Sequence, residues 1–262
     1  MAIFIASTLS LGACSMFSTD DEIEYRTVDD GMMLSRYEGN SSHDRLDIPD
    51  EYDGRPVTEI GDYAVAAAEY LTEITIGKNV CRIAERAFCG TCKNLKSFVV
   101  DPENPVYCSL DGVIFTKDMS TIIAYPDKRE GNGEYIVPDG VEKIANCAFY
   151  MCSSLKALTL SASVVEVGDY AFFKCSGLER LDLNEGLKTV GKDGFSFTES
   201  LTELHLPSTI EKIGDYGFYS KTSKISSFTT KKRIEQIECG KHWRPQTTGM
   251  ENTALMPVYV GE

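Results

Sequence analysis

The sequence holds one pair of cysteines at a spacing that could do chemistry, Cys89-Gly-Thr-Cys92. A Cys-x-x-Cys pair can exchange disulfides or supply two thiolates to a zinc ion. No second pair lies at zinc spacing, and no thioredoxin-like helix start surrounds the motif. We therefore expect neither a metal nor another cofactor, and we keep a thiol-redox role for Cys89 and Cys92 as an alternative.

A second group of reactive side chains comes from the three histidines, of which only His205 has a carboxylate at a useful spacing. His205 is expected one coil from Asp182, so the two could form a base and its orienting acid. Glu203 and Asp182 could equally form the carboxylate pair of a glycosidase. No nucleophile elbow or glycine-rich anion loop accompanies these residues. We expect no enzyme, with a secreted hydrolase as the alternative.

The eight cysteines that follow Cys14 are spread along the whole chain. Three of them, Cys92, Cys152 and Cys175, stand at the same position of a repeating pattern, three residues before a leucine. Cysteine at such a position behaves as a small apolar residue and is usually buried, so the register accounts for Cys92 without redox chemistry. We expect free thiols at Cys152 and Cys175, and the sequence assigns no disulfide.

The charge of the chain limits its partners. The formal net charge is −14 and the pI is about 4.7, and the densest basic run is Lys231-Lys232-Arg233. Nucleic-acid binding requires clustered basic residues that release counterions from phosphates, so we expect no such partner. Acidity of this kind keeps a protein soluble, and we expect a monomer.

The N-terminal residues 1–14 form an apolar run that closes with Leu11-Gly-Ala-Cys14. It is too short for a membrane-spanning helix, and it resembles a secretory signal whose final cysteine is acylated. Residues 15–24, which include Asp20-Asp-Glu22, would follow as a short acidic tether. No basic residue precedes the apolar run, so a hydrophobic N-terminal strand is the alternative.

One short pattern, aliphatic-Gly/Ala-x-x-Ala/Gly-Phe/Val, recurs through the chain at one regular spacing that a single longer interval interrupts. It begins at Ile60, Ile83, Ile144, Val167, Val190 and Ile213. Neighbouring copies begin 23 residues apart, with the exception of Ile83 and Ile144. A spacing of 23 residues falls in the range of roughly 20 to 29 residues that is typical of a leucine-rich solenoid. An alternating strand precedes each later copy, as in Leu178-Glu-Arg-Leu-Asp-Leu183, and places apolar and polar side chains on opposite faces.

The columns of the repeat predict which positions are interior. The last position should fill the core between coils, and it comprises Val65, Phe88, Phe149, Phe172, Phe195 and Phe218. The Ala or Gly before it should lie where neighbouring coils pass closely. The variable column two residues before the last position should be exposed; it comprises Tyr63, Arg86, Cys147, Tyr170, Asp193 and Tyr216.

Several segments depart from the regular array. Residues 101–133 form an insertion in which 112–116 and 121–125 read as a β-hairpin, placed as decoration on the array. The leader from residue 25 reads as a capping hairpin, and a degenerate seventh unit ends at Ile237. The solenoid should therefore cover 25–237, with a C-terminal cap or tail at 238–262.

These residues resemble the BspA-like leucine-rich repeat family. The family pattern includes Ile-Pro, Val-x-x-Ile-Gly-x-x-Ala-Phe and Cys-x-x-Leu, which match Leu206-Pro207, 164–172 and Cys175-Ser-Gly-Leu178. The likeness covers roughly residues 25–237. It implies an α/β-type repeat solenoid dominated by β structure, a right-handed array of six to seven 23-residue units with a hairpin cap and one hairpin insertion. Family members are typically surface proteins implicated in adhesion, with no catalytic residues to transfer.

We therefore expect an exported protein of the cell surface or envelope, with a lipid anchor at Cys14. Its strands should line a concave sheet that binds an extracellular protein or a glycan, with apolar residues at the centre of a mixed polar surface. The expected binding residues are Glu73, Thr75, Val99, Ile136, Thr159, Arg180, Asp182, Glu203 and His205. A purely structural spacer remains a further alternative.

Overall fold

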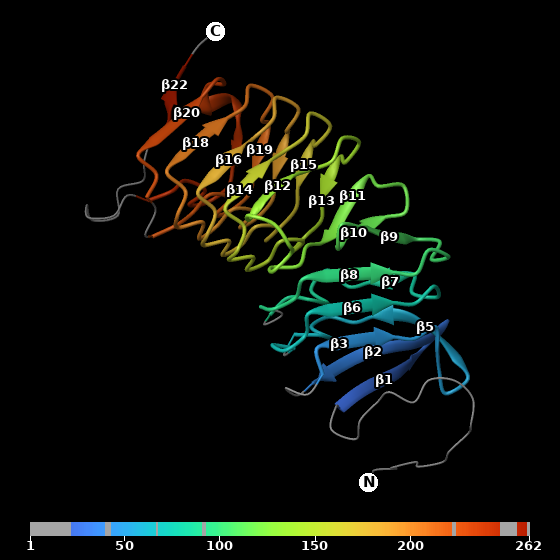
Figure 1. Cartoon of the computed structure of the whole chain (residues 1–262). Helices are drawn as coiled ribbons and strands as arrows, with labels where there is room; N and C mark the ends of the chain where they lie inside the picture. Colours follow the sequence, from blue (N-terminus) through green and yellow to red (C-terminus); the bar gives the residue numbers. More distant parts are fainter. Residues whose placement is uncertain are drawn as a thin grey trace.

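The computed structural model describes residues 22–39, 43–66, 68–90, 93–221, 224–246 and 256–260. Within these ranges the chain is almost entirely β, and the helical structure is limited to one 3-10 turn, η1 (Ile234–Gln236). Successive coils stack into a solenoid that runs from the N-terminal to the C-terminal end (Figure 1). The expected leader 1–14 and Cys14 lie outside the described residues, and the first strand begins at Glu22, inside the segment expected to be a tether.

The N-terminal end is closed by the expected hairpin. Strands β1 (Glu22–Val28) and β2 (Gly31–Glu38) pair antiparallel, with Val28 opposite Gly31 across a turn at Asp29-Asp30. Strand β5 (Arg55–Ile60) then joins β2 in parallel, and β4 (Glu51–Tyr52) pairs with β5. The hairpin covers the apolar end of the first coil, as an open solenoid requires.

The alternating segments form the long strands on one side of each coil. In order they are β3 (Arg45–Ile48), β6 (Glu73–Ile76), β8 (Ser97–Val100), β12 (Glu134–Ile136), β14 (Ala157–Thr159), β16 (Arg180–Asp182), β18 (Glu203–Leu206), β20 (Ser227–Thr230) and β22 (Val258–Tyr259). Their apolar positions, such as Leu158 and Leu204, point inward and are fully buried. In the described residues these strands make three separate parallel sheets, β3-β6-β8, β12-β14-β16 and β18-β20-β22, instead of one continuous sheet.

A second row of short strands, which the sequence did not predict, forms another side of each coil. It comprises β7 (Arg82–Ile83), β13 (Lys143–Ile144), β15 (Glu166–Val167), β17 (Thr189–Val190), β19 (Lys212–Ile213) and β21 (Glu238–Cys239). Most of these strands pair in parallel in one eight-stranded sheet, whose order is β21-β19-β17-β15-β13-β11-β10-β9. Each short strand has only a pair of residues, which is too few to show an alternating pattern in the sequence.

Aromatic rings form the interior ladder of the C-terminal coils, as the phenylalanine column predicts. The ring centroids of Phe149 and Phe172 lie 4.6 Å apart, those of Phe172 and Phe195 4.7 Å, and those of Phe195 and Phe218 5.3 Å. The small residue before each ring permits this packing. At Gly217, for example, an added Cβ would lie 2.5 Å from Ile213 Cγ2, closer than any real contact.

The variable column that was expected to be exposed is not uniformly so. Cys147, Tyr170 and Tyr216 are half-buried, and Asp193 is buried. These three and Asp193 adopt φ values of 53° to 60°, the left-handed conformation that turns the chain sharply between coils. In this turn Asp193 accepts a hydrogen bond at 2.7 Å from Ser196 Oγ, three residues further along the same coil.

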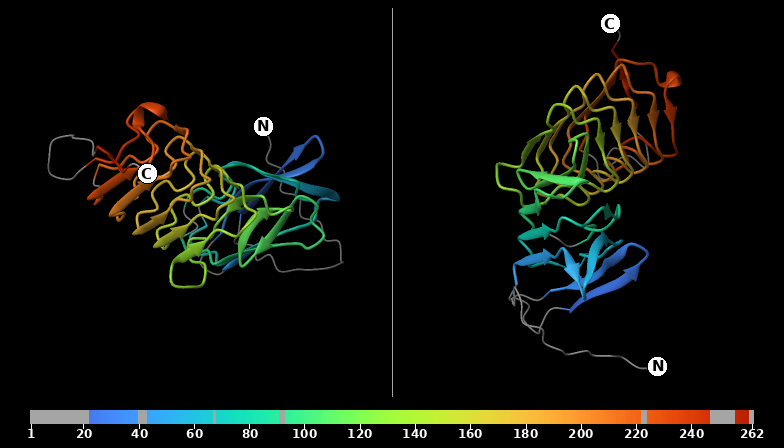
Figure 2. Two further views of the ribbon diagram at one scale, coloured as in Figure 1. Left: turned by 90° about the horizontal axis from the view of Figure 1, so that it is seen from above. Right: turned by 90° about the vertical axis from the view of Figure 1, so that its right-hand side faces the viewer.

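The insertion is built into the solenoid and is not a surface loop. The expected hairpin is present, as β10 (Val113–Thr116) and β11 (Thr121–Ala124), and a further strand, β9 (Tyr107–Leu110), pairs with β10. Strand β11 pairs in parallel with β13 and so begins the eight-stranded sheet. Within β10, Ile114 packs into the N-terminal core and Phe115 into the C-terminal core. The insertion therefore divides the interior in two, and the array changes direction there (Figures 1 and 2).

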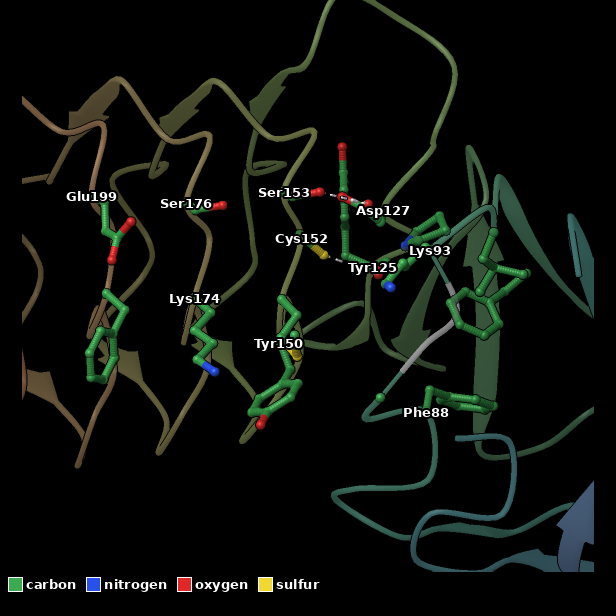
Figure 3. Close-up of a pocket in the computed structure, with 16 residues that line it drawn as sticks. Phe88, Lys93, Tyr125, Asp127, Tyr150, Cys152, Ser153, Lys174, Ser176 and Glu199 are labelled. Carbon is green, nitrogen blue, oxygen red and sulfur yellow. Dashed lines mark hydrogen bonds between the residues drawn. The ribbon is translucent and has the colours of Figure 1, made fainter. Parts of the chain in front are cut away.

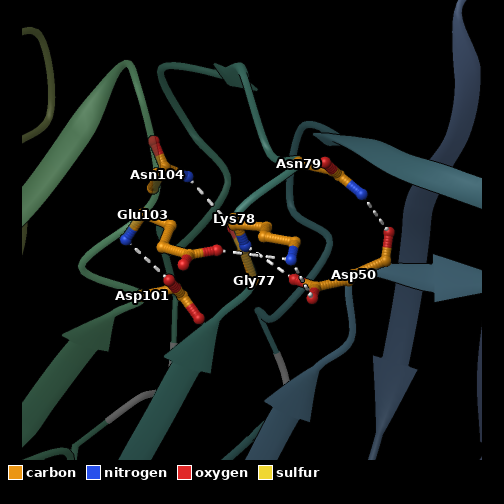
Figure 4. A network of polar contacts seen from close by, with 7 residues as sticks. All are labelled: Asp50, Gly77, Lys78, Asn79, Asp101, Glu103 and Asn104. Atoms are coloured by element: carbon orange, nitrogen blue, oxygen red, sulfur yellow. Dashed lines mark hydrogen bonds and ion pairs between the residues drawn. The ribbon is translucent and has the colours of Figure 1, made fainter.

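Asn104 attaches the start of the insertion to the preceding coil. Its buried amide nitrogen donates to the carbonyl oxygens of Gly77 (3.0 Å) and Val80 (2.9 Å), and its Oδ1 accepts from the backbone N–H groups of Val106 and Tyr107. On the surface beside it, Lys78 forms ion pairs with Asp50 of the preceding coil and with Glu103 of the following coil (Figure 4). The motif Asp-Pro-Glu-Asn-Pro105 thus has a structural role, because it fixes the start of the insertion to the preceding coil.

Candidate binding surface

The structure arranges the expected binding residues in columns on the outward side of the long strands, in three separate segments. Glu73 lies opposite Ser97 and Thr75 opposite Val99 in the first sheet. In the second sheet Ile136, Thr159 and Asp182 are in register, and in the third His205 lies opposite Thr229. Glu73, Thr75 and Thr159 are half-buried, while the other expected residues are exposed.

Val99 and Ile136 do not form the common apolar centre that the columns predicted. The insertion occupies the edge of β8: Phe98 N donates to Gly112 O at 2.9 Å, and Val100 N donates to Ser109 Oγ at 3.0 Å. Strand β12 therefore begins a new sheet. The side chains of Val99 (41% exposed) and Ile136 (71% exposed) are two separate apolar points, and Ile136 is the more prominent.

Charged side chains of both signs lie on the same outward side of the sheet as Ile136, in the neighbouring column. Arg180 Nη2 lies 3.1 Å from Glu134 Oε1 and reaches across β14, where the small, buried Ala157 leaves room. Hydrogen bonds from Asn132 and then from Arg180 hold the pKa of Glu134 below its usual value. Both charges are exposed, so the pair orients the side chains and adds little stability.

His205 does not pair with Asp182, the carboxylate that was kept as its alternative partner. The ring of His205 contacts Glu203 Oε2 at 3.3 Å through Nε2 and Thr229 Oγ1 at 2.6 Å through Nδ1. Asp182 instead accepts a hydrogen bond from Thr159 Oγ1 at 3.3 Å. Within the described ranges no hydrogen bond or ion pair joins His205 to Asp182, and the face around them is open.

The Cys-x-x-Cys motif is only partly within the described structure. Cys89 is buried and carries a free thiol, whereas Cys92 lies outside the described residues. Cys152 and Cys175 are buried free thiols, as expected. Among the residues that the structure describes, no group of three or more His, Cys, Asp or Glu side chains could hold a metal ion.

Sequence reasoning missed a cavity where the two parts of the core meet, which we call the seam cavity. Phe88 was expected in the interior, but it is half-buried and packs on Phe98 with ring centroids 4.8 Å apart. Tyr125 of the insertion takes the place beside Phe149, at 4.5 Å. The aromatic ladder is thus interrupted between Phe88 and Tyr125, and a cavity of about 290 Å³ opens there (Figure 3).

The seam cavity combines aromatic walls with a charged rim. Phe88, Phe98 and Tyr150 line it, and Lys93, Lys174 and Glu199 stand at its edge. Burial raises the pKa of Tyr125 to about 12, so this wall is a neutral phenol. The cavity is small beside the pockets that enclose drug-sized ligands. The single long interval between Ile83 and Ile144 was the sequence signal that the ladder is broken.

The repeat itself matches a known family. The family model for the BspA type leucine rich repeat region matches residues 39–109 and 132–241, in six copies. The chain belongs to the BspA-type leucine-rich repeat family. The unmatched residues between the two segments contain β10 and β11, so the hairpin is an addition to the repeat of this BspA-type protein.

Solved structures share the fold of this BspA-type chain. The pneumococcal vaccine antigen PcpA is 22% identical with a TM-score of 0.62, and the match covers 80% of this chain and 57% of that one. A leucine rich cell surface protein from Faecalibacterium prausnitzii is 21% identical with a TM-score of 0.58, covering 79% and 60%. The chain thus spans less than two thirds of either protein. No curated protein matches it.

Proposed function

We propose that this protein is a non-catalytic binding protein displayed on the cell surface, and that its partner is a protein. The contact surface is the outward side of β12, β14, β16, β18 and β20, which we call the C-terminal strand face. The observation that carries the proposal is the 71% exposure of Ile136 among charged groups of both signs. We assign Ile136 the role of the apolar anchor of this contact, and the charged side chains on the same face would orient the partner.

The composition of the C-terminal strand face favours a protein over a glycan. Its outward strand residues are Glu134, Ile136, Ala157, Thr159, Arg180, Asp182, Glu203, His205, Ser227 and Thr229. This set contains no Trp, Tyr or Phe ring on which a sugar could stack. It does contain a branched aliphatic side chain beside an arginine, and Arg is enriched at protein interfaces.

The shape of the array supports binding over catalysis. A solenoid presents extended open surfaces, whereas small-molecule sites are enclosed and largely apolar. The residues kept for a hydrolase, His205, Asp182 and Glu203, are exposed on that open surface. In the described part of the chain no helix is long and apolar enough to cross a bilayer.

Attachment to the cell envelope would come from Cys14, which lies outside the described residues. We propose that this cysteine is acylated after export, on the basis of the preceding Leu-Gly-Ala. Cells that produce the full chain can be labelled with an alkynyl fatty acid. Cys14→Ser should abolish incorporation, and equal labelling of both forms would exclude this anchor.

The binding proposal is tested by capturing partners on the immobilised chain from defined extracellular matrix proteins and glycans, followed by affinity measurements on variants. Ile136→Asp should weaken binding of the captured protein at least tenfold, because it places a charge in the desolvated centre of the contact. Val165→Asp is the matched control, since Val165 is also an exposed aliphatic but lies outside the long strands. The control should bind normally.

The double substitution Arg180→Ala with His205→Ala should lower the association rate and leave the melting temperature within a few degrees, because both side chains are exposed. If binding survives this change and Ile136→Asp, and is instead lost when the β10–β11 hairpin is altered at Lys117 and Asp118, the insertion is the contact surface. Selective capture of glycans would replace the protein partner with a carbohydrate.

A further inference from the structure

Two cysteines from opposite sides of the insertion meet at the seam. Cys89 belongs to the last coil before the insertion, and Cys147 belongs to the first coil after it. Both line a groove of about 170 Å³ that also includes Ala84 and Ala145 and adjoins the seam cavity at Phe88. Both thiols are free, and each shifts the pKa of the other, as expected for two side chains that lie close together in this groove.

The surroundings give the two thiols different chemical characters. The pKa of Cys147 is lowered, first by the hydrogen bond from Cys89 and further by the guanidinium of Arg86. The pKa of Cys89 is raised by the same hydrogen bond and by burial. Cys147 is also half-buried, whereas only 3% of Cys89 is exposed. Because the thiolate is the nucleophile, Cys147 is the thiol that attacks and Cys89 is the one that follows.

The remaining described thiols lack this arrangement. Cys152 and Cys175 lie on adjacent coils but are fully enclosed, and burial raises the pKa of both. Burial also raises the pKa of Cys239 and Cys108. Cys81 is exposed and free, but it does not line the groove. An electropositive, partly accessible setting is what distinguishes reactive cysteines from structural ones.

We propose that Cys89 and Cys147 are a redox modification site that takes small-molecule disulfides as oxidants and closes a covalent bridge across the seam. The Cys147 thiolate attacks one sulfur of the oxidant, which forms a mixed disulfide and releases one thiolate. Cys89 then loses its proton and attacks the sulfur of Cys147, forming the internal disulfide and releasing the second thiolate. The two protons from the protein thiols neutralise the two leaving thiolates, so two electrons pass to the oxidant.

The bridge would link the two parts of the core that the insertion separates. Cys89 follows Phe88, which packs on the N-terminal core, and Cys147 precedes Phe149 of the C-terminal ladder. Cross-linking residues that are distant in sequence restricts the unfolded chain and holds the groove closed. The inference rests on the proposed function in one respect only. It needs the protein to be exported, because exported proteins meet oxidising conditions.

The test uses the full chain, reduced and then incubated with oxidised glutathione under native conditions. Peptide mapping without reductant should show a Cys89–Cys147 cross-linked peptide, and two thiols should be lost. The melting temperature should rise by roughly 5 to 15 °C. Cys89→Ser should trap a glutathione adduct on Cys147, whereas Cys147→Ser should remove both products. Cys239→Ser is the matched control and should oxidise like the unchanged protein.

The rate at which each cysteine is alkylated gives a second test, which needs neither the variants nor a binding partner. Iodoacetamide should alkylate Cys147 of the reduced protein faster at pH 7 than Cys239, because the lowered pKa places more of Cys147 in the thiolate form. A Cys89–Cys92 peptide in place of the proposed one would assign the disulfide to the Cys-x-x-Cys motif and overturn the proposal. Alkylation of Cys147 no faster than Cys239, with no cross-link, would also overturn it.

Discussion

Phe88 and Phe172 occupy the same column of the repeat but have different surroundings. Phe172 is fully buried between the rings of Phe149 and Phe195. Phe88 has a neighbour on one side, Phe98, and faces the seam cavity on the other. The contribution of a repeat residue to the free energy of unfolding therefore depends on whether another coil packs against it. The residue type alone does not give this information.

The two phenylalanines give a direct stability test. Phe172→Ala should lower the free energy of unfolding by about 3 to 5 kcal/mol, because it removes a buried ring and leaves a void in the ladder. Phe88→Ala should lower it by less than about 2 kcal/mol, since part of the ring is already exposed. Urea denaturation measures both, with the exposed Glu179→Ala as a control that should change little. Equal losses at the two phenylalanines would mean that the seam is closed in solution.

At the scale of the elements, the insertion serves as a junction between two cores. Strand β11 pairs with the first short strand after it, and β10 sends alternate side chains into the two interiors. The attachment to the preceding coil depends on Asn104, whose amide satisfies two carbonyl oxygens and two N–H groups. A buried polar contact of this kind stabilises only while every partner is present.

Asn104→Ala should therefore destabilise the chain by about 3 kcal/mol or more, since it leaves backbone groups near Gly77 and Tyr107 without partners, at about 1 to 3 kcal/mol for each unsatisfied group. The exposed Asn94→Ala removes a single hydrogen bond, from Nδ2 to Glu69 O, and should lower stability by less than about 1 kcal/mol. Thermal unfolding compares the two. A small effect at Asn104 would show that water replaces its amide.

For the whole molecule, the division of the interior predicts two cooperative units. Ile74 belongs to the N-terminal core and Leu158 to the C-terminal core, and both are fully buried at equivalent positions of their strands. In a solenoid each coil contacts its neighbours only, so the weakened junction should limit the spread of local unfolding.

Hydrogen exchange followed by mass spectrometry tests this division. Ile74→Ala should raise exchange in β3, β6 and β8 by at least tenfold and leave β14 to β18 unchanged, whereas Leu158→Ala should do the reverse. Both substitutions remove a similar volume, so each serves as the control for the other. Uniform acceleration along the chain by either variant would show a single cooperative unit.

The sequence by itself determined the coil, because a 23-residue period and strand alternation are local patterns that each repeat carries within itself. The interior phenylalanines, the capping hairpin and the β10–β11 hairpin followed from those patterns. The outward orientation of alternate strand side chains followed as well, because strand alternation directs every second side chain away from the core.

Only the tertiary structure decided what happens at the break in the period. The separation of Val99 from Ile136, the exposure of Phe88 and the meeting of Cys89 with Cys147 all depend on where the insertion packs. The two-residue strands were also invisible in the sequence, because their pairing comes from the stacking of coils. These features arise from contacts between residues far apart in the chain, and no periodic pattern within a single repeat encodes them.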